Sequence, residues 1–268
     1  MPTVTNRGAS LYYSVDGEGP PIVFIADAGL GGWLWGWQHA ALAGPFETVI
    51  WDLRGTGRSD APGGPYALET LVSDFEAVCR AVGARRVNVV GLGLGGAIAL
   101  AAAHRTSRVE TLTLIGTAAH ESAYDLEPMG APLEDVESSD QYDRDDVRRS
   151  TAAMLSPDFR NRHPDVVDGI VDWRLEGDAT PAGFHAQRGA LSGFDARDWL
   201  VDVTQPTQVL HGMADERVPD SAGRDLARGL PRGSFVPLEG AGHLANVEHS
   251  RTVSDRLFGF LESQRESL

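Results

Sequence analysis

The chain has 268 residues, of which 42% are hydrophobic, and a formal net charge of −15 at pH 7. That length is enough for one large domain with a full core or for two small ones. An acidic chain without a basic stripe argues against nucleic acid and anionic membranes as partners. No run of about eighteen apolar residues predicts a membrane span, and the first residues lack the basic and apolar blocks of a signal peptide, so a cytoplasmic location is expected.

Cofactor and metal signals are weak in this sequence. The single cysteine, Cys79, lies in the apolar stripe of a predicted helix, which indicates a packed side chain rather than a nucleophile. No cluster of metal-ligating residues is visible, so neither a metal nor a cofactor is expected. The run at 91–96 contains G-x-G-x-x-G, but it does not follow the first strand, as a dinucleotide fingerprint does.

Strand and helix patterns alternate through the first part of the chain. Residues 9–15 alternate in polarity like an edge strand, whereas 22–25 are apolar throughout, as in a strand buried on both faces. Further strands are predicted at 48–51, 87–90 and 109–115, and helices at 68–82 and 97–103. Such alternation favours parallel pairing through right-handed crossovers, so we expect an α/β fold with a mostly parallel, twisted sheet and helices on both faces.

The alternation stops after Gly116. Helical segments without strands between them follow, at 143–155, 164–175 and 181–191. Strands resume at 207–210 and 234–238, with helices at 221–230 and 247–261. We therefore expect a core made of residues 1–118 and 195–268, with a helical insertion at 119–194.

The stretch V-N-V-V-G-L-G-L-G-G at 87–96 leads from a β-branched run through a glycine-dense corner into an alanine-rich helix. A strand, a sharp turn and a helix in this order form a nucleophile elbow, whose G-x-S-x-G pattern has a serine at the corner. Here the middle residue is Gly93. Without a hydroxymethyl group no acyl-enzyme forms through serine, and glycine also removes the backbone strain of the corner.

Three further motifs lie at the ends of predicted strands. They are D-L-R-G-T-G-R-S at 52–59, H-G-M-A-D-E-R-V-P at 211–219 and E-G-A-G-H at 239–243. With the elbow, and in this order, they resemble the α/β-hydrolase superfamily in its cap-bearing bacterial branch. The resemblance covers nearly all of the chain and implies an α/β-hydrolase fold in which residues 119–194 form a helical cap.

The resemblance gives Asp215 and His243 the roles of acid and histidine. The Asp215 carboxylate, just past a buried strand, is placed to accept the imidazole N–H, fix its tautomer and favour its protonated form. His243 is then the expected general base, with a pKa near the working pH. The alternative is that Asp215 only caps a turn and that His243 is an ordinary loop histidine.

The loop after the second predicted strand departs from the family pattern, which has His-Gly ahead of an oxyanion-hole amide. Counting back from the following motif places A-D at 26–27 in the His-Gly position, with the backbone amides of Ala28 and Leu94 as donors of the hole. A second register makes A-G at 28–29 the equivalent pair and Leu30 the donor.

Asp27 lies at the rim of this expected hole, in a loop otherwise made of Ala, Gly and Leu. An ionised carboxylate there opposes an oxyanion, whereas a raised pKa makes it a proton donor or acceptor. Asp27 is therefore a third candidate for catalysis. In the alternative reading it turns away and caps the following helix.

Aromatic and histidine side chains supply candidates for the wall of the pocket. Trp33, Trp35 and Trp37 recur at a spacing of two, so a regular helix does not bury all three. We expect Trp33 and Trp35 at the pocket mouth, where an aromatic wall suits a flat or polycyclic substrate, with core packing as the alternative. His120, just past a strand, and His185, in the insertion, are further candidates, with a structural or solvated role as the alternative.

A base, its orienting acid and backbone amide donors remain once serine is removed. These groups suit proton abstraction with stabilisation of an enolate or phenolate, and relatives of this fold use the histidine in that way without acylation. We therefore expect a cofactor-independent enzyme of natural-product biosynthesis that uses His243 as base on an aromatic or polyketide-like small molecule. The expected reactions are C–C bond formation or cleavage, cyclisation, elimination and cofactor-free oxygenation.

Three alternatives stay open. In the first, His243 activates water directly and the chain is a hydrolase. In the second, it is a pseudo-hydrolase that binds a small molecule without turnover. In the third, Gly93 is an engineered replacement for the serine of an ordinary hydrolase.

Overall fold

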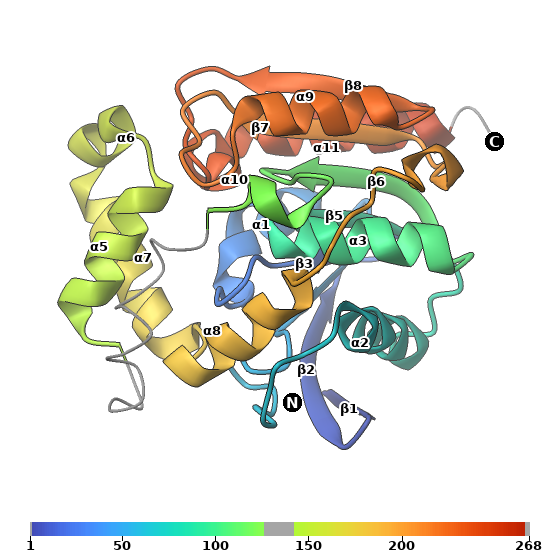
Figure 1. Ribbon diagram of the computed structural model, residues 1–268, viewed down its shortest axis with the longest axis horizontal. Coiled ribbons are helices and arrows are strands. Elements are labelled where there is room, and N and C mark those ends of the chain that lie inside the picture. Colours follow the sequence, from blue (N-terminus) through green and yellow to red (C-terminus); the bar gives the residue numbers. More distant parts are fainter. Residues whose placement is uncertain (1, 126–141, 266–268) are drawn as a thin grey trace.

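The computed structural model of the chain describes residues 2–125 and 142–265. Its strands are β1 (Thr3–Asn6), β2 (Ala9–Asp16), β3 (Pro21–Ile25), β4 (Glu47–Trp51), β5 (Val87–Leu92), β6 (Val109–Ile115), β7 (Thr207–Gly212) and β8 (Gly233–Leu238). They form one eight-stranded sheet in the order β1-β2-β4-β3-β5-β6-β7-β8 (Figure 1). Only the β1–β2 and β2–β4 pairs are antiparallel, so the predicted mostly parallel sheet is confirmed.

Helices cover both faces of the sheet, as the sequence predicts. In Figure 1, α3 and α9 lie in front of the strands and α11 lies behind them. None of the helices in the described part of the chain has the length and apolar character to cross a membrane. The helices are α1 (Gly36–Leu42), α2 (Leu68–Ala81), α3 (Leu94–Arg105), α5 (Arg144–Met154), α6 (Pro157–Arg162), α7 (Pro164–Gly177), α8 (Pro181–Arg188), α9 (Asp220–Gly229), α10 (Ala245–Glu248) and α11 (Ser250–Arg265).

Several predicted boundaries differ from the structure. The polar edge strand β1 has no hydrophobic alternation and was not predicted, and neither was the six-residue helix α6. The helix expected at 181–191 ends at Arg188 and continues as the 3₁₀ turn η4 (Gly189–Leu191). The last helix is divided into α10 and α11, where His249 interrupts the helical backbone with a ψ of 40°.

The centre of the sheet is packed very closely against α3. All six residues of β5 are buried, and so are the alanines of α3 from Ala97 to Ala103. At Gly95, a Cβ atom would lie only 2.2 Å from the carbonyl oxygen of Ile25. Glycine is therefore required there for α3 to approach β3, and this approach brings the start of α3 beside the loop that follows β3.

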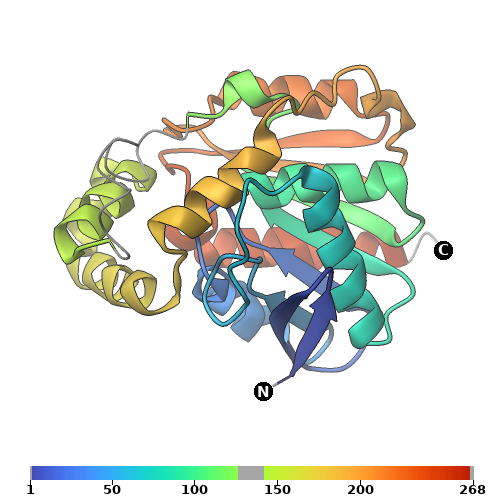
Figure 2. The same cartoon turned by 60° about the horizontal axis from the view of Figure 1, so that its bottom comes forward.

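Helices α5, α6 and α7 form a separate layer at one end of the sheet, and α8 returns from it across the strand ends (Figures 1 and 2). The fully buried side chain of Gln187 ties α8 to the sheet loops. It accepts from the Gly29 N–H at 2.7 Å and donates to the Arg54 carbonyl at 2.7 Å and to the Thr56 hydroxyl at 2.5 Å. The exact limits of the expected insertion, 119–194, stay a prediction, and its residues 126–141 lie outside the described part.

Candidate active site

Loops at the carboxyl ends of four parallel strands meet at one point of the sheet. Asp27 follows β3, Gly93 follows β5, Asp215 follows β7 and His243 follows β8. In an open parallel sheet this edge is where ligands bind. The side chains of Asp27, Asp215 and His243 are at most 2% exposed, so the site is closed to bulk solvent.

The corner of the nucleophile elbow is kept although its side chain is missing. Gly93 has φ 52° and ψ −116°, a conformation that L-residues adopt only at a cost of about 1–3 kcal/mol. Its N–H donates to the Ile115 carbonyl at 3.1 Å, and its own carbonyl accepts from the Gly96 N–H at 3.0 Å. Contacts with the neighbouring strand β6 and the first turn of α3 therefore hold the corner.

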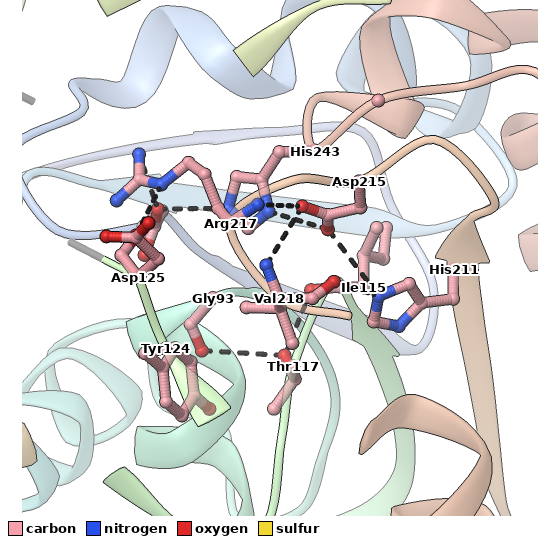
Figure 3. Close-up of polar contacts among 12 residues, drawn as sticks. Gly93, Ile115, Thr117, Tyr124, Asp125, His211, Asp215, Arg217, Val218 and His243 are labelled. Carbon is pink, nitrogen blue, oxygen red and sulfur yellow. Dashed lines mark hydrogen bonds and ion pairs between the residues drawn. The ribbon is translucent and has the colours of Figure 1, made fainter. Parts of the chain in front are cut away.

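Asp215 and His243 pair as the sequence predicts (Figure 3). The Nδ1 atom of His243 lies 2.8 Å from Oδ2 of Asp215. The other carboxylate oxygen of Asp215 accepts from the N–H groups of Arg217 and Val218, at 2.8 and 3.0 Å. Asp215 therefore does more than cap a turn. Its Oδ1 accepts from the turn, and its Oδ2 orients the ring of His243.

The side chain of Asp27 points to the elbow and does not cap the following 3₁₀ turn η1 (Gly32–Trp35). Its Oδ1 accepts from the Leu94 N–H at 2.8 Å, and its Oδ2 lies 3.2 Å from Nε2 of His243. A Cβ atom added at Gly93 would lie 2.1 Å from Oδ1 of Asp27 and 2.4 Å from its Cγ. The carboxylate of Asp27 thus occupies the space that a side chain at the elbow would need.

The expected oxyanion hole is partly filled by the same carboxylate. The Leu94 N–H, one of its two predicted donors, is taken by Asp27. The Leu30 N–H donates to the Asp27 carbonyl at 3.1 Å, so the register that makes Leu30 the second donor is wrong. Ala28, the donor in the other register, is fully buried next to Asp27 and stays a prediction.

The charges of the site correct the expected protonation state of His243. Burial alone would lower the pKa of His243, but the Asp215 and Asp27 carboxylates raise it to about 9. Burial likewise opposes the ionisation of Asp27 and Asp215, but His243, with Arg217 in the case of Asp27, holds the pKa of each carboxyl below its ordinary value. At neutral pH His243 is therefore an imidazolium between two carboxylates, rather than a neutral base with a pKa near the working pH.

Known proteins share this framework. Residues 20–250 match the family described as alpha/beta hydrolase fold. The chain belongs to this family. The AB hydrolase superfamily protein YisY of Bacillus subtilis is 28% identical over 267 residues, which cover 97% of this chain and 98% of that protein.

Two enol-lactonases are among its relatives in the α/β-hydrolase family. The 3-oxoadipate enol-lactonase 1 of Acinetobacter baylyi is 26% identical over 265 residues, which cover 97% of this chain and 96% of that protein. The crystal structure of the enol-lactonase from Burkholderia xenovorans LB400 has a TM-score of 0.87 and 26% sequence identity, covering 97% of this chain and 100% of that chain. The predicted α/β-hydrolase fold is thus confirmed, and its relatives include enzymes.

Two residues of this α/β-hydrolase site were missed in the sequence. Arg217 is 2% exposed, and its Nη1 atom lies 3.8 Å from Oδ2 of Asp27. His211 is fully buried, and its Nε2 lies 2.8 Å from the Val218 carbonyl and 3.5 Å from Oδ2 of Asp215. Burial lowers the pKa of His211, so this ring is neutral at pH 7. Both residues stand in the quoted stretch at 211–219, but nothing in its spacing shows that they turn inward.

The tryptophans predicted at the pocket mouth lie elsewhere. Trp35 is fully buried in the core, with its ring centroid 5.2 Å from that of Phe24. Trp33 packs against Trp173 of α7, and its indole N–H donates to the Asp178 carboxylate at 2.7 Å. The prediction for Trp33 and Trp35 was wrong because η1 winds as a 3₁₀ turn, which sends one ring into the core and the other toward α7.

The two histidine candidates also lie outside the Asp27–His243 cluster. His120 forms an isolated bridge with Asp195, and its Nδ1 lies 2.9 Å from the exposed Ser122 hydroxyl. His185 lines a cavity of about 630 Å³ together with Tyr124 of the loop after β6. Within residues 2–125 and 142–265, no group of three or more His, Cys, Asp or Glu side chains is arranged to hold a metal ion.

Proposed function

We propose that this α/β-hydrolase-fold protein is an enzyme that acts on a small molecule by proton transfer through Asp27 and His243, without a serine acyl-enzyme. The observation that carries the proposal is the position of the Asp27 carboxylate. It fills the space of the elbow side chain, accepts the Leu94 N–H and faces Nε2 of His243. This is the place from which the elbow side chain of an α/β-hydrolase acts on its substrate.

Asp27, rather than His243, is the group that takes the proton in this mechanism. The Nε2 atom of His243 carries a proton at neutral pH because the pKa of the ring is raised to about 9. The ionised Asp27 carboxylate therefore accepts a proton from a C–H or O–H acid of the substrate. The negative charge that develops on the substrate is stabilised by the imidazolium and by the guanidinium of Arg217.

A weakly basic carboxylate restricts the substrates. The pKa of Asp27 is below its ordinary value, so the proton must come from an acidic position, such as a carbon next to a carbonyl group whose enolate the two cations stabilise. Bond formation or cleavage, cyclisation, elimination and oxygenation of such substrates share this first step. The proposal does not depend on an aromatic or polyketide-like substrate or on natural-product biosynthesis. Trp33 and Trp35, which suggested that class, lie outside the site.

Hydrolysis is the second candidate, because the relatives include enol-lactonases. In that reaction Asp27 and His243 activate a water molecule that attacks an ester or lactone. The Leu94 amide would serve the oxyanion only after Asp27 releases it, which makes this candidate weaker. Incorporation of ¹⁸O from labelled water into the acid product, at a rate that His243→Ala abolishes, would favour hydrolysis.

Deuterium exchange tests the first candidate without knowledge of the natural substrate. The unmodified chain and His243→Ala are incubated in D₂O with a panel of aryl ketones, 3-oxo esters and 2-oxo acids, and exchange at the acidic carbon is followed by mass spectrometry. We expect exchange by the unmodified chain and a loss of about 10²-fold or more in His243→Ala. The exposed substitution His104→Gln is the control. Equal exchange by His243→Ala and the unmodified chain would contradict the proposal.

A further inference from the structure

Arg217 is a buried cation whose terminal side-chain donors, on Nη1 and Nη2, are not used. Its side chain is 2% exposed, and neither Nη1 nor Nη2 has a hydrogen-bond partner. The 3.8 Å between Nη1 and Oδ2 of Asp27 is too long for a hydrogen bond. Nε makes one long contact, of 3.4 Å, with the Asp125 carbonyl.

The backbone of Arg217 is held firmly in place, so the position of its guanidinium follows from the fold. Its N–H donates to Oδ1 of Asp215 at 2.8 Å, and its carbonyl accepts from the Asp125 N–H at 2.7 Å. The turn that places the Asp215 carboxylate against His243 therefore also places Arg217 over Asp27. In Figure 3 the side chain of Arg217 lies between the labelled residues Asp125 and His243.

The two other deeply buried arginines of the described chain each donate short hydrogen bonds through Nε and one terminal nitrogen. Arg54 donates to both oxygens of Asp74, at 2.5 and 2.6 Å. Arg174 donates to Asp178 at 2.6 Å and to two hydroxyl groups of α5 at 2.9 and 2.7 Å. A buried guanidinium with unused donors costs stability unless a ligand supplies the acceptors. The contrast therefore indicates that the donors of Arg217 serve a ligand.

We propose that Arg217 binds a carboxylate group of the substrate through Nη1 and Nη2. The planar fork of a guanidinium matches the two oxygens of a carboxylate, and the burial of Arg217 strengthens such a pair. This assignment rests on the proposed function and narrows its substrate class. Since Nη1 lies 3.8 Å from the Asp27 carboxylate, the acidic C–H must stand close to the substrate carboxylate, as it does in 2-oxo and 3-oxo acids.

Space for the rest of such an acid lies beyond the loop segment whose Asp125 carbonyl contacts Nε of Arg217. Tyr124, the residue before Asp125, lines the cavity of about 630 Å³. The phenol of Tyr124 is held at Ala118, with 3.0 Å to both its N–H and its carbonyl. Much of the remaining wall is apolar and includes Pro65, Ala186 and Leu191, which suits the hydrocarbon part of an organic acid.

Matched acids and amides test the assignment by binding alone. Acetate, benzoate and 3-phenylpropanoate are titrated against the unmodified chain, each beside its primary amide, by calorimetry and thermal shift. At least one acid is expected to bind about tenfold or more tightly than its amide, and Arg217→Gln is expected to lose this preference. Arg228→Gln, which removes an exposed arginine of α9, is the control and keeps it.

Several results would overturn the assignment. They are equal binding of every acid and its amide, no binding of any acid, or an unchanged preference in Arg217→Gln. If Arg217→Gln does not fold, Arg217→Lys keeps the charge without the fork and must still weaken acid binding severalfold. Asp27→Asn is expected to abolish deuterium exchange while acid binding persists, so a failure of this assignment and a failure of the proposed function give different results.

Discussion

The two halves of the site use the family framework in different ways. On one side, Asp215 and His243 keep the arrangement that the sequence motifs predict, with 2.8 Å between carboxylate and ring. On the other side, the elbow has lost its side chain, and a carboxylate from the loop after β3 fills its place. The backbone corner of the elbow is thus kept in the absence of the side chain that it usually presents. The backbone of Gly93 retains the strained shape, while the Asp27 carboxylate occupies the space of its missing side chain.

The largest expected effect is the loss of proton transfer in Asp27→Asn. The amide keeps an acceptor for the Leu94 N–H but takes no proton, so deuterium exchange should fall by about 10²- to 10⁴-fold. Mass spectrometry of the exchanged substrate measures the rate. Asp195→Asn, an exposed carboxylate change, is the control. Full exchange by Asp27→Asn would reduce Asp27 to a group that merely fills space.

A second test measures the steric overlap between a side chain at position 93 and the Asp27 carboxylate. Gly93→Ala should lower the free energy of unfolding by about 2–4 kcal/mol, because the added methyl meets the Asp27 carboxylate at a positive φ. Gly83→Ala has a similar φ of +73° with open space around it, so it should cost only about 1 kcal/mol. Urea unfolding measures both values.

The double variant Asp27→Gly with Gly93→Ala lacks the overlap, so relative to Asp27→Gly alone it should lose only about the 1 kcal/mol that Gly83→Ala costs. The corresponding Asp27→Gly with Gly93→Ser should then gain activity on p-nitrophenyl acetate, since serine, His243 and the freed Leu94 amide restore the usual parts. If Gly93→Ala costs no more than Gly83→Ala, the two positions do not compete for space.

The pH dependence of stability tests the charge pattern that joins the two halves. The pKa of His243 rises from 6.5 to about 9 on folding, so its contribution is fully present below pH 6.5 and is lost as the pH rises through about 9. The unmodified chain should lose about 2–3 kcal/mol more than His243→Gln over this range. Urea unfolding at several pH values measures the difference, with His104→Gln as control. Parallel curves for the unmodified chain and His243→Gln would show that the ring is neutral.

The smallest expected effect concerns the tryptophans. Trp33→Phe removes the indole N–H that donates to the buried Asp178 carboxylate, so stability should fall by about 1–2 kcal/mol. Deuterium exchange should stay unchanged, because the ring lies against α7 and not in the site. If Trp33→Phe loses deuterium exchange while its free energy of unfolding is unchanged, Trp33 contributes to the substrate pocket.

The sequence predicted the sheet and three of the charged groups of the site. Apolar runs located β3, β5, β7 and β8, and the loops that follow β3, β7 and β8 contain Asp27, Asp215 and His243. The direction of Asp27 was not predictable, because it depends on the close approach of α3 to β3. Arg217 was missed for a similar reason. Its inward turn is set by a local hydrogen bond to Asp215 and a tertiary one with Asp125, which leave no periodic pattern.

The side chain of Gln187 limits how a substrate can reach this closed site. Because its three hydrogen bonds link α8 to separate loops of the sheet, swinging α8 outward would break all of them, at about 1 kcal/mol each. These bonds favour the observed position of α8 by about 3 kcal/mol in total. If the chain acts as proposed, the rate at which a substrate passes α8 or the segments around it sets an upper limit on turnover.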